Sequence, residues 1–154
     1  MSHDSANPHR EYTTFLAALL EGDLKDCTRI TDRIVSSGVS LQKIYESYFS
    51  PALYQVGDLW ACNMLSVARE HTATSIVESL MNRLYLQQSF KGSSGGKALI
   101  VTLEGELHQV GAKMVADIFE LNGWETAFPG SDRNMAEVLD LIEQEQPDVR
   151  AVSA

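Results

Sequence analysis

Hydrophobic residues before position 91 recur every three or four residues, which is the spacing of amphipathic helices. Asn7 has the side chain of an N-cap and precedes a proline suited to a first helical turn. Pro51 either kinks a later helix or starts a renewed one, and a final helix is predicted over 66–86. Because these four or five helices are joined by short turns, we predict an all-α helical-bundle domain over 8–90.

The pattern changes at 91–96, where the sequence Lys-Gly-Ser-Ser-Gly-Gly indicates a flexible linker. The remaining residues, 97–154, alternate between short apolar runs and amphipathic stretches. The predicted elements are a strand over 98–103, a helix over 110–121, a strand over 124–128, a helix over 134–144 and a strand over 149–153. This order predicts an α/β Rossmann-like (flavodoxin-like) parallel sheet with right-handed crossovers.

A parallel sheet that stops at its third strand would leave an apolar edge strand unpaired. Ser153 and Ala154 fall in or directly after that strand. We therefore expect residues 97–154 to be the N-terminal part of a larger Rossmann-like domain, incomplete at its C-terminus, and the chain to be a piece of a longer protein.

The formal net charge of −9 argues against binding of nucleic-acid phosphates or an anionic membrane by this segment. Cys27 and Cys62 have the spacing of neither a metal site nor a disulfide framework, so a reducing cytoplasm is expected. The N-terminus lacks the features of a signal peptide, and the apolar runs are far shorter than the roughly 18 residues of a membrane span. Neither half pairs a nucleophile with a base, so no catalytic residue is assigned.

The loop after the first predicted strand carries a carboxylate and an imidazole two positions apart, Glu106 and His108. Ligands of open parallel sheets bind outside the carboxyl ends of the strands, where this loop lies. A neighbouring carboxylate fixes the tautomer of an imidazole ligand, and Gly111 lets a bulky group approach the backbone. These residues alone fit either a metal or cofactor site or an ordinary surface histidine near a helix start.

A second group lies in the helical half, where Trp60 is followed by nine residues and then by Glu70 and His71. A tryptophan at the end of one helix and a Glu-His pair early in the next would meet across a tight turn. The same residues also fit a core tryptophan beside a solvated pair, so their spacing alone leaves the function open.

Together the two groups resemble cobalamin-binding modules, in which a helical-bundle cap precedes a Rossmann-like cobalamin domain. The loop is similar to the family's Asp/Glu-x-His-x-x-Gly motif. The helical group is similar to the caps of CarH-type adenosylcobalamin photoreceptor regulators, and it comprises Trp60, Glu70 and His71.

The resemblance implies that His108 ligates cobalt from below and that Glu106, beside Gly111, accepts the hydrogen bond from its other nitrogen. It implies that Trp60 covers an upper adenosyl group. It makes His71 a candidate second axial ligand after loss of that group. The other implied cofactor contacts are Val67, Glu70, Thr74 and Ser153.

Ser153 matches the serine of the family's Ser-x-Leu motif at the end of the third strand. The leucine of that motif and the Gly-Gly that lines the slot for the nucleotide tail have no counterpart before Ala154. The pocket for the tail is therefore expected to be incomplete within these residues.

Three functions follow from the resemblance. The first is a sensory or regulatory module, with adenosylcobalamin favoured over methylcobalamin, that acts in light sensing and transcription regulation through a downstream output domain or partner protein. It would form homo-oligomers through the helical bundle. The second is a corrinoid carrier of a methyltransferase system, although such carriers more often have Asp where Glu106 stands. The third is a truncated interaction domain that binds no cofactor.

Overall fold

The computed structural model describes residues 8–90, 92, 95–103, 109–130 and 133–153. The chain forms two compact units, Met1–Leu86 and Gln87–Ala154, which we call the helical unit and the sheet unit. The predicted fold class, a helical domain followed by a parallel α/β sheet, is confirmed. Among the helices that the structure describes, none has the length and apolar character of a membrane span.

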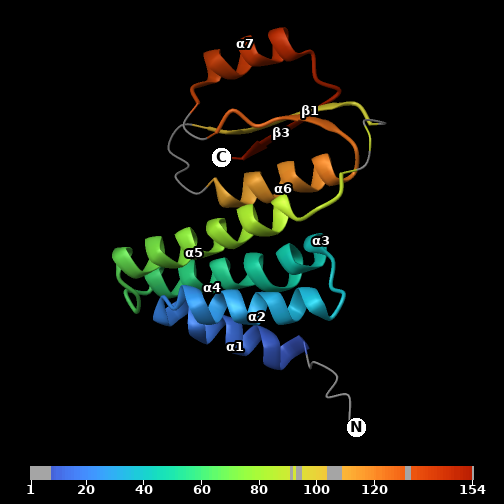
Figure 1. Cartoon of the computed structure of the whole chain (residues 1–154). Helices are drawn as coiled ribbons and strands as arrows, with labels where there is room; N and C mark the ends of the chain where they lie inside the picture. The colour runs from blue at the N-terminus through green and yellow to red at the C-terminus, as the bar shows by residue number, and fades with distance from the viewer. Residues whose placement is uncertain (1–7, 91, 93–94, 104–108, 131–132, 154) are drawn as a thin grey trace. The chain divides into compact units, whose positions relative to one another are not determined.

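The helical unit is drawn from blue to green in Figure 1. Its elements are α1 (Pro8–Glu21), α2 (Leu24–Ser36), α3 (Leu41–Ile44), the π-helical segment η1 (Tyr45–Phe49), α4 (Ser50–Ala61) and α5 (Val67–Leu86). The predicted periodicity therefore corresponds to real helices. Asn7, the expected cap of the first helix, lies outside the described residues.

Aromatic side chains from different helices meet at the centre of the helical unit. The ring of Phe49 stacks on Phe15 of α1 and on Tyr45, with centroids 5.4 Å and 6.0 Å apart. All three rings are almost fully buried. Such rings remove large apolar areas from water and gain further from offset stacking, so they hold α1 against the middle of the bundle.

Pro51 lies in the first turn of α4, which confirms one of the two predicted alternatives, and the turn before it shifts its hydrogen-bond register. In an α-helix the carbonyl of Ser47 would accept a hydrogen bond from residue 51, and proline has no N–H to donate. The turn before Pro51 widens instead, and the N–H of Ser50 donates to the carbonyl of Tyr45, five residues back. The π-helical segment η1 thus joins α3 to α4 without a break in the helical path.

A partly buried ion pair joins α1 to α2. The Arg33 guanidinium donates to Glu11 Oε2 at 2.7 Å, and the Glu11 side chain is largely hidden from water. Burial, and then the charge of Glu11, raises the pKa of Tyr48. The arginine supplies the opposite charge that a carboxylate needs in this position.

The sheet unit contains β1 (Lys97–Thr102), α6 (Val110–Leu121), β2 (Glu125–Ala127), α7 (Met135–Glu145) and β3 (Val149–Ser153). The strands are parallel and lie in the order β2-β1-β3. The strand predicted over 124–128 is shorter than expected because the N–H of Trp124 closes the end of α6 by donating to the carbonyl of Phe119.

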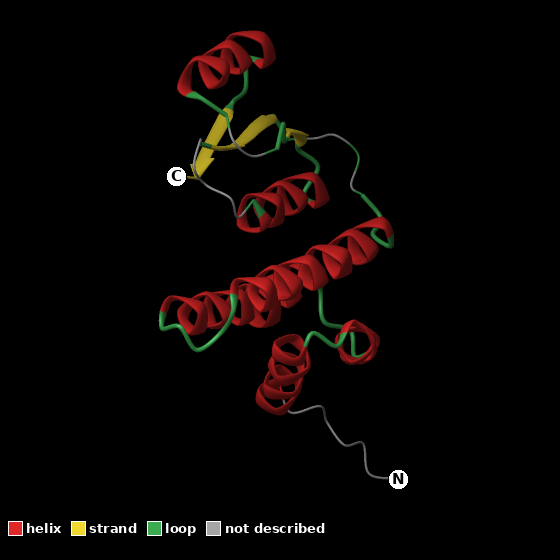
Figure 2. Ribbon diagram, turned by 90° about the vertical axis from the view of Figure 1, so that its left-hand side faces the viewer, coloured by secondary structure: helices red, strands yellow, loops and turns green. Residues whose placement is uncertain are grey.

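Helices α6 and α7 cover opposite faces of the sheet, as Figures 1 and 2 show. Alternate residues of β1 divide between the two faces, as the pleat of a strand requires. Ala98 and Ile100 pack with α6, whereas Leu99 and Val101 pack with Val138 of α7. Because helices cover both faces, β1 is the apolar centre of this unit. The carboxyl ends of the strands lie at one end of the sheet, which we call its carboxyl edge.

Gly95 and Gly96, which the sequence places in the linker, hydrogen-bond to the sheet unit. The N–H of Gly95 donates to the carbonyl of Gly123, and the carbonyl of Gly96 accepts from Glu125. A Cβ on Gly95 would lie 2.9 Å from the Trp124 ring, and one on Gly96 would meet the Asp148 carboxylate. Here glycine serves close backbone approach rather than flexibility.

Candidate functional site

Trp60 lies in the last turn of α4 and is half exposed, with 46% of its surface accessible to solvent. The chain turns directly after it, where Asn63 adopts φ 58° and the N–H of Met64 donates to the carbonyl of Leu59. The Ser66 hydroxyl then accepts from the N–H of Arg69 in the first turn of α5. The tight turn predicted between Trp60 and the Glu-His pair is therefore present.

Glu70 is the buried member of the pair, and its carboxylate has two partners on α5. Oε2 lies 2.5 Å from Nδ1 of His71, and Oε1 accepts a hydrogen bond from the Thr74 hydroxyl at 3.1 Å. The side chain of His71 itself is 67% exposed, against 9% for Glu70. A carboxylate on Nδ1 orients the ring and leaves Nε2 on the solvent side of this contact as the nitrogen available to a ligand or metal.

The predicted cap residues of α5 lie on one side of that helix. Val67, His71 and Thr74 are separated by four and three residues, so they are neighbours on a helical surface. Val67 and His71 are exposed, and Thr74 is partly buried. We call these three residues, together with the half-exposed Trp60 of α4, the cap surface; Glu70, next to His71 in the sequence, is buried.

At the sheet unit, the carboxyl ends of β1 and β3 lie side by side. Thr102 is in register with Ser153, and the N–H of Leu103 donates to the Ser153 carbonyl at 2.9 Å. Ser153, the predicted tail contact, is exposed at this edge. Gly111 lies in the first turn of α6, and no atom of the described residues lies within 4 Å of a Cβ built there.

Two residues central to the sequence prediction, Glu106 and His108, lie outside the described residues. In the sequence they come between β1 and α6. Among the described residues, no three His, Cys, Asp or Glu side chains form a cage for a metal ion. The corrin ring of cobalamin supplies four nitrogen ligands to its cobalt, so a cobalamin site does not require such a cage.

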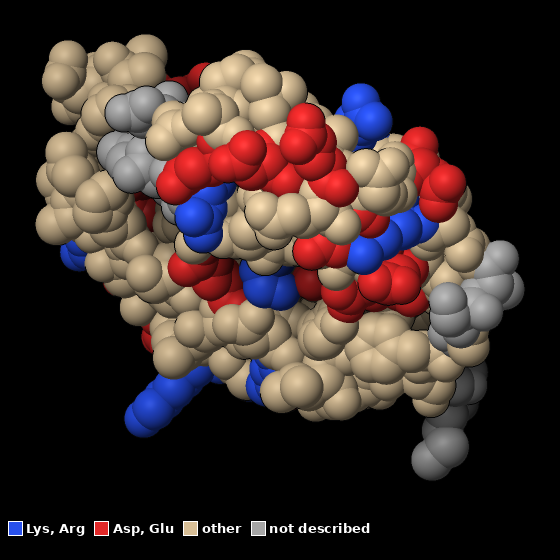
Figure 3. All heavy atoms as spheres, turned by 90° about the horizontal axis from the view of Figure 1, so that it is seen from above, with Lys and Arg blue, Asp and Glu red and all other residues tan. Residues whose placement is uncertain are grey.

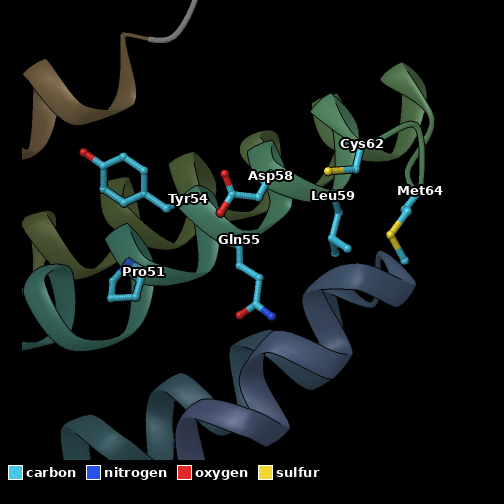
Figure 4. A pocket seen from close by; sticks show the side chains of 7 residues that line it. All are labelled: Pro51, Tyr54, Gln55, Asp58, Leu59, Cys62 and Met64. Carbon is cyan, nitrogen blue, oxygen red and sulfur yellow. The ribbon is translucent and has the colours of Figure 1, made fainter.

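The helical unit also has a shallow hollow of about 510 Å³, lined by Pro51, Tyr54, Gln55, Asp58, Leu59, Cys62 and Met64 (Figure 4). At about 100° of rotation per residue, Gln55 and Trp60 are roughly 140° apart around α4. The hollow is therefore on a different side of α4 from Trp60, and none of the predicted site residues lines it.

On the face of the molecule in Figure 3, the side chains of Asp and Glu cover more surface than those of Lys and Arg. From Lys97 to Ala154 the sequence holds eleven acidic and four basic residues, a formal net charge of −7. Such a surface repels phosphate backbones and favours a neutral or cationic ligand. One of the four cations, Arg133, lies at the carboxyl edge of the sheet, where its N–H donates to the Thr102 carbonyl. The sequence prediction overlooked Arg133, although an arginine between the predicted second strand and second helix of an acidic half was a usable signal.

Comparison with known families identifies both units. The family described as "B12 binding domain" is matched twice, by one profile over residues 12–85 and by a second over residues 96–154. Together the two matches cover nearly all of the residues that the sequence assigned to a cap and a cofactor domain.

Curated relatives include proteins of two kinds. The chain is 27% identical over 134 residues to the HTH-type transcriptional repressor CarA of Myxococcus xanthus, covering 87% of this chain and 43% of the repressor. It is 20% identical over 140 residues to trimethylamine corrinoid protein 2 of Methanosarcina mazei, covering 89% of this chain and 64% of that protein. The chain thus spans less than two thirds of each of these relatives.

A solved structure shares the fold. The monomethylamine corrinoid protein of Methanosarcina barkeri superposes with a TM-score of 0.77 at 15% identity, over 95% of this chain and 71% of that one. At this identity the likeness concerns the fold, a helical unit followed by a parallel α/β unit.

Proposed function

Because this chain belongs to the B12-binding family and carries both of its domains in tandem, we propose that it is a sensory module whose cap surface responds to the upper ligand of bound cobalamin. The observation that carries the proposal is the exposed Trp60 together with His71 held by the buried Glu70. An indole of this size exposed at a helix end offers a rigid apolar surface to a ligand.

The residues divide into a lower and an upper group. His108, with Glu106 and Gly111, is proposed to hold cobalt from below, and Ser153 is proposed to contact the nucleotide tail. When bound, cobalamin supplies a cobalt–carbon bond that light or a partner protein can break. The upper contacts proposed are Trp60, Val67, His71 and Thr74.

In the upper group, Glu70 is proposed to orient His71 rather than to contact the cofactor. Its carboxylate holds Nδ1 of His71 and is itself held by Thr74, so the imidazole keeps one orientation. Nε2 is then the nitrogen left available, and it is the group that we propose would bind cobalt if the upper ligand were lost. Trp60 would exclude water from the upper face.

We favour adenosylcobalamin because a large adenosyl group matches a tryptophan cap, and we place the protein in light-dependent regulation by analogy with the CarA-like sequence. Its output then resides in a further domain or a partner, and the helical unit forms the contacts of an oligomer. The alternative function is a methyl carrier, which the likeness to corrinoid proteins supports. A cytoplasmic location accords with either function.

Reconstitution with adenosylcobalamin and with methylcobalamin separates these functions. The sensor predicts retention of adenosylcobalamin in the dark and a change of absorbance and oligomer size under green light. The carrier predicts transfer of the methyl group from methylcobalamin to a thiol acceptor with a methyltransferase partner. Failure to retain either corrinoid would mean that the chain is an interaction domain only.

The variant His71→Ala tests the upper ligand, with His9→Ala, an exposed histidine of α1, as the matched control. Loss of the bis-imidazole absorbance shift after illumination in His71→Ala, with the shift retained in His9→Ala, supports the assignment. The same shift in both variants rejects it while leaving cobalamin binding intact.

A further inference from the structure

Arg133 extends the sheet at its carboxyl edge. It forms a parallel bridge with Leu103, and its N–H donates to the Thr102 carbonyl at 3.3 Å. It therefore lies beyond the end of β1, on the side of that strand where β2 pairs. Ligands of open parallel sheets are bound outside this edge.

The guanidinium of Arg133 has few partners in the described part of the chain. Nη2 donates to the carbonyl of Pro129 at 2.9 Å, whereas Nε is buried without a hydrogen-bond partner. Glu137 approaches Nη1 only to 4.0 Å, and its other oxygen already accepts the N–H of Asn134 in the capping box of α7. Arginine carries five donors, so most of its capacity is left for another acceptor.

The other cations of the sheet unit that the structure describes are differently placed. Lys97 pairs with Glu125 and Glu145 at the amino end of β1, and Lys113 pairs with Asp117 within α6. Arg150 stands opposite Leu99 in the middle of the sheet. Arg133 is therefore the one described cation at the carboxyl edge, in a unit whose surface is strongly acidic.

We infer that Arg133 is a cofactor-contact residue whose guanidinium donates to an amide carbonyl on the rim of the corrin ring. The inference rests on the proposed binding of cobalamin. The rim of cobalamin carries neutral amide side chains, each with a carbonyl acceptor, and a planar fork of N–H groups suits such oxygens. The contact is made by the terminal nitrogens of a side chain that is 38% exposed, because Nε itself is covered by the protein.

A purely structural role is the competing explanation. In that role Arg133 ties the chain between β2 and α7 through the Pro129 carbonyl and Glu137, and its removal lowers stability without altering ligand preference. A rim contact instead makes the protein sensitive to the charge of the amide that Arg133 touches. Conversion of that amide to a carboxylate strengthens a guanidinium contact, because charge-assisted hydrogen bonds are roughly twice as strong as neutral ones.

The test uses cobalamin and its separated monocarboxylic acid derivatives, in each of which one rim amide is a carboxylate. Affinity is measured for the parent, Arg133→Met, Arg133→Lys and the control Arg150→Met. We expect the parent to bind one derivative about tenfold more tightly than the others. This affinity ratio corresponds to one hydrogen bond between charged groups. Arg133→Met loses this preference, Arg133→Lys keeps part of it, and Arg150→Met keeps all of it.

The outcomes are distinguishable from failure of the proposed function. If the parent retains no corrinoid, both the function and the contact are wrong. If the parent retains cobalamin and Arg133→Met ranks the derivatives as the parent does, the contact alone is wrong. If Arg133→Met does not fold, Arg133→Lys decides, because an unchanged tenfold preference in a variant that has lost the planar fork overturns the inference.

Discussion

The buried carboxylate of Glu70 lies 2.5 Å from Nδ1 of the exposed imidazole of its neighbour in sequence, His71. Adjacent residues of a helix point in directions about 100° apart, so only a ring turned back toward the preceding side chain makes this contact. The contact converts an ordinary surface histidine into one with a fixed orientation. Most of the proposed upper-face chemistry depends on it.

Removal of the Glu70 carboxylate should change the tautomer of His71. In the parent the proton is expected on Nδ1, because the carboxylate accepts it there. In Glu70→Ala the ring should become a mixture in which the Nε2–H form predominates. Long-range ¹H–¹⁵N correlation spectra at alkaline pH distinguish the two forms. Nδ1–H signals of equal weight in parent and variant would contradict the expectation, and His9 serves as the internal control.

Arg69 should contribute to the stability of the helical unit by capping α1. Its Nη1 donates to the carbonyls of Glu21 and Leu20, which have no partner within the helix. Arg69→Met should lower the free energy of unfolding by about 1 kcal/mol, as for one partly exposed hydrogen bond from a charged group. Urea denaturation measures the free energy of unfolding of this variant and of the control Arg10→Met. If both variants lose the same free energy of unfolding, the cap does not contribute to stability.

Gly96 should tolerate no side chain, in contrast to Gly92. A Cβ on Gly96 would overlap the Asp148 carboxylate, which accepts the N–H of Lys97 at the start of β1. Gly96→Ala should therefore cost about 1–3 kcal/mol of stability of the sheet unit. Among the described residues, no atom lies within 4 Å of a Cβ on Gly92, and Gly92→Ala should change stability by less than about 0.5 kcal/mol. A neutral Gly96→Ala would mean that the start of β1 is looser than described.

Cys27 should be unreactive toward alkylation while Cys62 reacts. Burial, and then the charges of Asp23 and Asp26, raise the pKa of Cys27 to about 12, so its thiol stays protonated at pH 9. Because the unfolded thiol ionises near pH 9 and the folded one does not, this group also makes stability fall as pH rises from about 9 toward 12. In Cys62→Ser, iodoacetamide at pH 8.5 should label Cys27 negligibly in the native protein and completely in denaturant. Rapid labelling of the native protein would contradict the burial of Cys27.

The order of helices and strands was predictable from the sequence because hydrophobic period alone determines it in both halves. The place of Pro51 in the first turn of a renewed helix was one of the two predicted alternatives. The π-helical register before it was not predictable, because the sequence contains no sign of the wider turn that absorbs the missing N–H. The docking of Gly95 and Gly96 was also unpredictable. It depends on Trp124, some thirty residues later, and a Gly-Ser run has the same composition whether docked or free.

The candidate site was predictable to different extents in its two halves. Spacing placed Trp60, Glu70 and His71 around one turn, but it could not show that Glu70 is buried and His71 exposed, which depends on packing. Arg133 was missed because its bridge to Leu103 arises only when the chain after β2 extends alongside β1. The assignments of Glu106 and His108 stay predictions, since both fall outside the described residues.

The most direct test of the central claim is electron paramagnetic resonance of the protein loaded with cobalamin in its Co(II) form. If His108 holds the metal from below, the axial nitrogen splitting changes from a triplet to a doublet when histidine is labelled with ¹⁵N. This change should persist in His71→Ala and vanish in His108→Ala. A triplet that is unchanged by ¹⁵N labelling of histidine would show that the cofactor's own benzimidazole remains bound to cobalt. That result would contradict the assignment of His108 as the lower ligand.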